Sequence, residues 1–217
     1  AAVGGIAAVF LFNFGGSSAT SAISAALVLA GALMFVFEFL LYRRFVDFLF
    51  RKAVSKNVYA VRKPYGEVKR RVILGGHADA AWEWTWSYHG QMKTLGPAIL
   101  GSVGGLFYAF AVNLGYLVSG APPLDGAWKV LGLIQFVFIP FFILIMFFIN
   151  WKVIVDGAND NLTACYASMA VLKEMAEEDF RFENTEVCCL ITGSEEAGLR
   201  GAKAFAKKHK EELKACE

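Results

Sequence analysis

The sequence predicts an α/β domain that is interrupted by a transmembrane helical hairpin and preceded by membrane helices. Hydrophobic residues make up 57% of the chain, including 20 phenylalanines, which is more than a globular core needs. Two long apolar runs are flanked by segments in which strand-like and helix-like patterns alternate. The formal net charge is only +2, so the charge balance gives no sign of a nucleic-acid partner.

Residues 1–55 are predicted to form membrane spans and an interfacial helix. The opening run AAVGGIAAVFLFNF is shorter than the roughly 20 residues that cross a bilayer, so we expect it to be the end of a longer span. Residues 21–42 are long enough to span, with a soluble core helix as the alternative. They carry one acid, Glu38, which we expect to face other helices or the interface. Residues 43–56 alternate basic and aromatic side chains, which favours a helix on the membrane surface.

Residues 95–150 are predicted to form the transmembrane hairpin. The runs LGPAILGSVGGLFYAFAVNLGYLV and VLGLIQFVFIPFFILIMFFIN are each about 20 residues or longer. Gly101 and Gly105 have the GxxxG spacing that lets helices approach closely. Lysine and arginine are frequent in residues 43–71 and from 151 onward, whereas the loops GGSSAT and SGAPPLDGA have none. The positive-inside rule therefore predicts a multi-pass protein of the plasma (inner) membrane, with both flanking segments in the cytoplasm.

Residues 56–94 and 151–217 are predicted to be two parts of one α/β domain. Strands are expected at 58–61 and 68–74, in WKVIV and in TEVCCLITG, and helices in LTACYASMAVLKEMAEEDF and LRGAKAFAKKHKEELK. This alternation favours a sheet with largely parallel strands. The four cysteines form no CxxC pair, so free thiols are expected at Cys165, Cys188, Cys189 and Cys216.

Candidate metal ligands follow three of the predicted strands. His77 and Asp79 follow the first, Asp160 the second, and Glu195 with Glu196 the third. Loops at the carboxyl ends of parallel strands converge on one crevice, and imidazole with carboxylate suits a zinc site. Each residue alone also has a structural explanation, as a hydrogen-bonded histidine, a turn aspartate or helix-capping glutamates. Together they favour a metal centre.

The stretches GGHADA, GANDNLTA and GSEEAGLRGAKAFA resemble three motifs of the zinc aminopeptidases of metallopeptidase family 28. The resemblance covers residues 57–94 and 151–217, with the membrane hairpin inserted between the first and second motifs. It implies part of a zinc-exopeptidase-like, doubly wound sheet. Two departures are Leu162, where the family has a small residue, and Ala202, where serine is common.

The resemblance also implies roles for the candidate residues. His77 and Glu196 would bind one zinc ion, and Asp160 would bridge two. The Asp79 carboxylate would orient the His77 ring, and Glu195 would be the general base that takes a proton from the attacking water.

The family places a further acidic ligand and a final histidine C-terminal to these motifs. Neither His89 nor His209 suits the role of that histidine. The resemblance therefore implies a fragment that lacks the C-terminal part of the catalytic domain, with one of two zinc sites largely present. Such a fragment is expected to be inactive by itself.

Two functions are compatible with these residues. A membrane-bound zinc aminopeptidase acting on peptides is favoured, because the ligands and the base are all present. The alternative is a catalytically inactive, peptidase-like scaffold or assembly subunit. Three alternating tryptophans either line a substrate pocket or, as we favour, lie at the bilayer interface, where tryptophan is enriched: Trp82, Trp84 and Trp86. The oligomeric state cannot be predicted.

Overall fold

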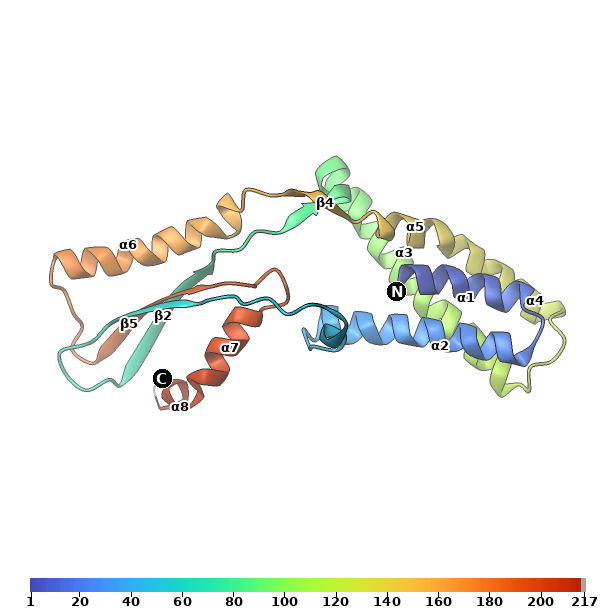
Figure 1. The fold of residues 1–217 in the computed structure, drawn as a ribbon, viewed down its shortest axis with the longest axis horizontal. Coiled ribbons are helices and arrows are strands. Elements are labelled where there is room, and N and C mark those ends of the chain that lie inside the picture. The colour runs from blue at the N-terminus through green and yellow to red at the C-terminus, as the bar shows by residue number, and fades with distance from the viewer. Residues whose placement is uncertain (216–217) are drawn as a thin grey trace. The chain divides into compact units, whose positions relative to one another are not determined.

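The computed structural model describes residues 1–215, which fold as two compact units. The helical unit consists of Ala1–Leu49 and Trp82–Val153. The sheet unit consists of Phe50–Ala81 and Ile154–Glu217. Each unit is therefore assembled from two stretches of chain, as Figure 1 shows by colour.

The helical unit is built from apolar helices that pack side by side (Figure 1). Three helical stretches are long and apolar enough to cross a membrane, namely Ser18–Leu40, Met92–Val118 and Gly126–Met146. They correspond to the three spans expected from the sequence. The elements are α1 (Ala2–Phe14), α2 (Ser18–Met34) with its π-helical extension η1 (Phe35–Leu40), α3 (Thr85–Val118), α4 (Gly126–Ile134), the 3-10 turn η3 (Gln135–Phe138) and α5 (Ile139–Met146).

Small residues let the helices of the hairpin approach closely. A Cβ atom on Gly101 would overlap the Phe141 ring, and one on Gly105 would lie 2.7 Å from Phe138 Cβ. The Ser102 hydroxyl donates a hydrogen bond to the Phe141 carbonyl oxygen at 2.8 Å. The close approach predicted from the GxxxG spacing is thus confirmed, and the facing residues are phenylalanines of α5 and η3.

The segment after the first long apolar stretch differs from its prediction. Residues 43–56 contain only a short 3-10 helix, η2 (Asp47–Leu49), so the expected interfacial helix is wrong. At helical spacing the aromatic residues Phe45, Phe48 and Phe50 do not gather on one face apart from the basic residues, so the segment lacks the two-sided pattern of a surface helix. Glu38 lies near the end of the first long apolar stretch, where its Oε1 accepts the N–H groups of Phe45 and Val46 at 2.5 and 2.6 Å.

The strand predicted in WKVIV also has a different partner from the one expected. It forms β4 (Ile149–Ile154), which pairs with β3 (Trp82–Trp84) in a separate two-stranded sheet. Helices α3 and α5 pack together, and this brings the chain just before α3 beside the chain just after α5. The Thr85 N–H accordingly donates to the Phe148 carbonyl oxygen at 2.9 Å. Proximity at the base of the hairpin therefore decides the pairing.

The sheet unit has three strands in the order β1-β5-β2. These are β1 (Val58–Arg62), β2 (Arg70–His77) and β5 (Thr185–Thr192). Strand β2 runs parallel to β5, as predicted, whereas β1 runs antiparallel to it. The loop between β1 and β2 is too short for the crossover that parallel strands require. The prediction of largely parallel strands is therefore correct for one of the two pairings.

Helices cover both faces of this sheet (Figure 1). Helix α6 (Thr163–Glu177) packs on β2 and β5, and its Cys165 is buried. Helices α7 (Arg200–Lys208) and α8 (Lys210–Lys214) lie on the other face, where Phe205 packs against the Tyr59 ring of β1. Cys165, Cys188 and Cys189 are buried free thiols, as expected, and Cys216 lies outside the described residues.

Candidate metal centre

The candidate ligands meet at one edge of the sheet unit because β2 and β5 are parallel. His77 is the last residue of β2 and lies in register with Thr192, the last residue of β5. The loop that follows β5 carries Glu195 and Glu196. Parallel strands that end together deliver their following residues to the same edge. The sheet therefore places the imidazole beside the paired carboxylates.

A glycine allows the third contributor, Asp160, to reach this edge. A Cβ atom on Gly76 would lie 2.8 Å from the Cys165 backbone nitrogen, so only glycine lets the start of α6 pack this tightly on β2. The Cys165 thiol also donates to the His77 carbonyl oxygen at 3.2 Å. Asp160 lies in the turn η4 (Ala158–Leu162) just before α6, and its backbone is not helical. Close packing of α6 thus holds this turn beside the end of β2.

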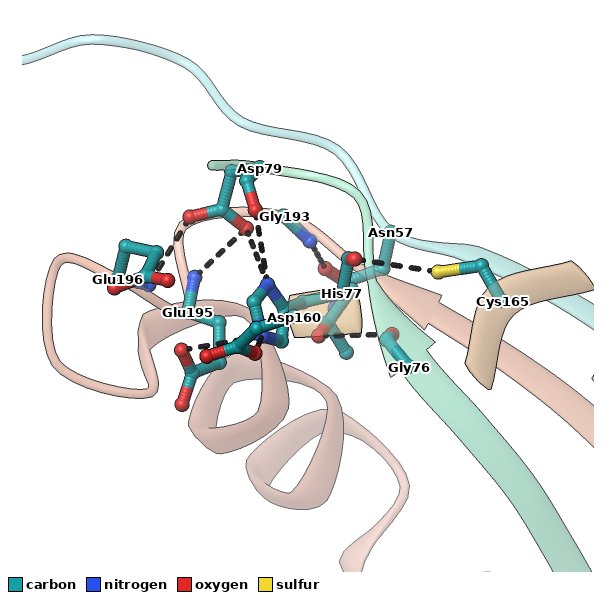
Figure 2. Close-up of polar contacts among 10 residues, drawn as sticks. Asn57, Gly76, His77, Asp79, Asp160, Cys165, Gly193, Glu195 and Glu196 are labelled. Atoms are coloured by element: carbon teal, nitrogen blue, oxygen red, sulfur yellow. Dashed lines mark hydrogen bonds and ion pairs between the residues drawn. The ribbon is translucent and has the colours of Figure 1, made fainter. Parts of the chain in front are cut away.

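The His77 ring is buried and is held at both nitrogens (Figure 2). Its Nδ1 lies 3.0 Å from the main-chain oxygen of Asp79, which can only accept, so Nδ1 carries a proton. Its Nε2 lies 2.9 Å from Asp160 Oδ1 and 3.5 Å from Glu195 Oε2. The ring therefore turns its second nitrogen toward two carboxylates, as a metal-ligating histidine does.

The Asp79 carboxylate has partners besides the expected one. Its Oδ1 lies 3.8 Å from His77 Nδ1, longer than a hydrogen bond but within the distance of an ion pair. Its two oxygens accept the backbone N–H groups of Glu195 and Glu196, at 3.1 and 3.0 Å (Figure 2). The main-chain oxygen of Asp79 therefore makes the shorter contact with the histidine ring, while the carboxylate also holds the loop after β5.

Three side chains converge closely enough to hold a metal ion. One ligand atom from each of His77, Asp160 and Glu196 lies within 4.8 Å of the others. The histidine is buried, and the two carboxylates are exposed. One imidazole nitrogen with carboxylate oxygens is a donor set that suits a divalent cation such as zinc. The residues present therefore fit a metal ion.

The charges in this group also favour a cation. Burial lowers the pKa of His77, but hydrogen bonds to the Asp79 main chain and Asp160 and the charge of Glu195 outweigh it, so the net shift is upward. Burial raises the pKa of Glu196, and the charges of Glu195 and Asp160 raise it further. Several carboxylates thus share a small volume, and a bound cation would offset their repulsion.

Sequence reasoning missed one residue of this edge, Asn57, which directly precedes β1. Its Nδ2 donates to the Gly201 carbonyl oxygen at 2.8 Å, and its Oδ1 accepts the Gly193 N–H at 3.3 Å. Gly193 and Gly201 lie before and after the two glutamates in the chain. Nothing in the local pattern identifies a lone asparagine before a strand, so contacts distant in sequence were needed to find it.

The remaining histidines lie elsewhere in their units. His209 follows α7, where its Nδ1 lies 3.1 Å from Glu212 Oε2 and its ring stacks on Phe205. His89 belongs to α3 in the helical unit, where its ring packs against Tyr88. Neither is a member of the converging group. The three alternating tryptophans also belong to the helical unit.

Imidazole and carboxylate donors that converge beside a further carboxylate are characteristic of metal-dependent hydrolases. Residues 147–217 match the family model described as Peptidase family M28, which confirms the resemblance seen in the sequence. This part of the chain is therefore similar to a stretch of an M28 peptidase domain. The match includes Asp160, Glu195 and Glu196, whereas His77 and Asp79 precede it. No curated protein and no solved structure matches the chain.

Proposed function

We propose that this chain is the membrane-anchored part of a zinc-dependent aminopeptidase, which removes N-terminal residues from peptides. The convergence of His77, Asp160 and Glu196 within 4.8 Å carries this proposal. The family match supports a peptidase, and the converging side chains support a bound metal ion. In the complete protein the sheet unit would form part of a larger, doubly wound sheet.

His77, Asp160 and Glu196 would hold the metal. Zinc, when bound, lowers the pKa of water and polarises the scissile carbonyl group. The Asp160 side chain is 79% exposed, so it has room to serve a second ion as well. Further ligands for that second ion would come from another part of the complete protein.

Glu195 is our candidate for the general base. Its Oε2 lies 3.5 Å from His77 Nε2, so the carboxylate is next to the proposed ligands without belonging to the converging group. Its backbone N–H is held by Asp79, which limits movement of the side chain's attachment point. A carboxylate in this position can take a proton from the attacking water and give it to the leaving amine.

We further propose that the apolar helices anchor the enzyme in a plasma (inner) membrane with the sheet unit in the cytoplasm. Support comes from the three helices of sufficient length and from the basic residues at 43–71 and beyond 151. A protease added to intact cells should then leave the sheet unit uncut and should cut it in inverted vesicles. Cleavage in intact cells would show that the sheet unit lies outside the cytoplasm.

The metal is tested by measuring zinc per chain in detergent-purified protein. We expect zinc to bind to the wild type and to be lost in His77→Ala. His209→Ala is the matched control, because it removes a histidine of the same unit outside the converging group. Glu195→Gln should retain zinc, because Glu195 is not a proposed ligand.

Activity is tested in the complete protein, reconstituted in lipid and assayed on peptides with free and blocked N-termini. Glu195→Gln should lose hydrolysis while keeping its zinc, and blocked peptides should remain intact. Absence of zinc from the complete wild-type protein would sink the enzyme proposal. It would leave the peptidase-like scaffold as the better account.

A further inference from the structure

The Asn57 side chain contacts both ends of the loop that carries Glu195 and Glu196. The segment 50–56 leads into β1, and Asn57 is the residue directly before that strand. Its side-chain amide bonds to Gly193 at one end of the loop 193–201 and to Gly201 at the other. Figure 2 shows the contact between Asn57 and Gly193. Both ends of the glutamate-bearing loop are therefore tied to one side chain.

The packing around this amide leaves no room for side chains on the loop ends. A Cβ atom on Gly201 would overlap the Gly193 carbonyl oxygen. One on Gly193 would overlap the Ser55 hydroxyl and lie 3.0 Å from the Lys56 carbonyl oxygen. The loop is thus closed on itself and pressed against the incoming segment, with the Asn57 amide between its ends.

We infer that Asn57 is a positioning residue of the proposed metal centre, which fixes the loop that carries Glu195 and Glu196. The inference rests on the proposed function. Asp79 holds the two glutamates through their own backbone N–H groups. Asn57 acts at the ends of the same loop, so the two residues restrain different parts of it. Glu196 reaches His77 and Asp160 only while both restraints are in place.

The choice of residue follows from its chemistry. One contact needs an acceptor for the Gly193 N–H and the other needs a donor for the Gly201 carbonyl oxygen. A carboxamide supplies both at a fixed separation, whereas a carboxylate supplies only acceptors and alanine neither. A serine hydroxyl has both functions but is too short to reach both partners. Asn57→Ser should therefore have an intermediate effect.

The first test needs no metal. Hydrogen exchange of peptides covering 193–201 is measured in the metal-free, detergent-purified chain for wild type, Asn57→Ala and Asn57→Ser. We expect exchange in this loop to accelerate about fivefold or more in Asn57→Ala, the size of one lost hydrogen bond. Asn184→Ala is the matched control: it is a half-buried asparagine at the opposite end of β5. It should leave exchange in the loop unchanged.

The second test is zinc affinity, measured by competition with a chelator. Loss of a residue that orients a metal ligand usually weakens metal affinity tenfold to about a hundredfold. We expect a shift in this range for Asn57→Ala and a smaller one for Asn57→Ser. The two alanine variants should have similar melting temperatures without metal. A purely structural role would lower the melting temperature of Asn57→Ala and leave the affinity unchanged.

The outcomes separate this inference from the proposed function. Unchanged exchange in the loop of Asn57→Ala and Asn57→Ser overturns the inference, whether or not the chain binds zinc. Faster exchange with unchanged zinc affinity also overturns it, because the loop would then not position the ligand. A wild-type chain without zinc defeats the proposed metal site, and with it the positioning role. If Asn57→Ala does not fold, hydrogen exchange of the loop and zinc affinity in Asn57→Ser test the inference in its place.

Discussion

The Asp79 carboxylate accepts the backbone N–H of Glu195 at 3.1 Å and that of the following residue at 3.0 Å. A side chain at the end of β2 thereby fixes the main chain of the loop after β5. The same residue orients the His77 ring through its main-chain oxygen, 3.0 Å from Nδ1. Asp79 therefore links the imidazole and the two glutamates, and a change in its side chain leaves the main-chain contact with the ring in place.

Asp79→Asn should weaken zinc binding without releasing the histidine ring. One carboxylate oxygen is replaced by an NH₂ group, which cannot accept the backbone N–H that faces it. Zinc affinity is expected to fall about tenfold to a hundredfold. Asp156→Asn, which removes the same charge from an exposed position of this unit, is the control for electrostatic effects. Equal affinities for the two variants would show that the loop is held by other contacts.

Gly76→Ala should separate α6 from the end of β2. The added Cβ would lie 2.8 Å from the Cys165 nitrogen and 3.0 Å from its Sγ. Overpacking of this kind typically costs about 1–3 kcal/mol. Because Asp160 lies in the turn before α6, zinc affinity should fall along with the melting temperature. An unchanged affinity in a destabilised variant would mean that the turn holds Asp160 in place without α6.

The sequence was sufficient to find the converging side chains because they lie in short motifs at strand ends. His77 ends an apolar strand, and the strands β2 and β5 are parallel as expected. The three long apolar helices were also predicted, since length and apolarity suffice to recognise them. The motifs and the helices depend on residues close together in the chain, and the parallel pairing was inferred from the alternation of strands and helices.

Features that depend on distant contacts were not predicted. The partner of β4 was set by the packing of α3 against α5, which brought β3 within reach. The role of the Asp79 carboxylate depended on the position of the loop after β5, more than a hundred residues further along the chain. The role of Asn57 was not predicted for the same reason, because its two partners are also distant in the sequence.

The glycines of α3 allow a comparison within one helix. A Cβ on Gly101 would overlap Phe141, whereas one on Gly104 would meet nothing within 4 Å. Gly101→Ala should therefore force the hairpin apart and lower the melting temperature in detergent. Gly104→Ala should be neutral or stabilising, because alanine favours a helix over glycine by about 0.5–1 kcal/mol. Equal melting temperatures for the two variants would argue against this packing of the hairpin.

A buried ion pair joins β2 and β5 on the sheet face covered by α7 and α8. Arg71 Nε lies 2.5 Å from Glu186 Oε1, and the two side chains are only 13% and 7% exposed. The Arg71 guanidinium also donates to the Glu212 carbonyl oxygen at 3.0 Å. Removing Glu186 takes the carboxylate away from a buried guanidinium, which costs more than the pair itself contributes.

Glu186→Ala should therefore destabilise the sheet unit by about 3–5 kcal/mol, read from native-state hydrogen exchange of the β5 amides. The double variant Arg71→Met with Glu186→Leu should lose less than Glu186→Ala alone, because no charge is then left buried. Glu177→Ala is the control, since it breaks an ion pair with Lys173 whose side chains are 56% and 71% exposed. Such an exposed pair contributes at most about 0.5 kcal/mol on a helix. A loss in Glu186→Ala as small as in this control would mean that Arg71 finds other partners or reaches water.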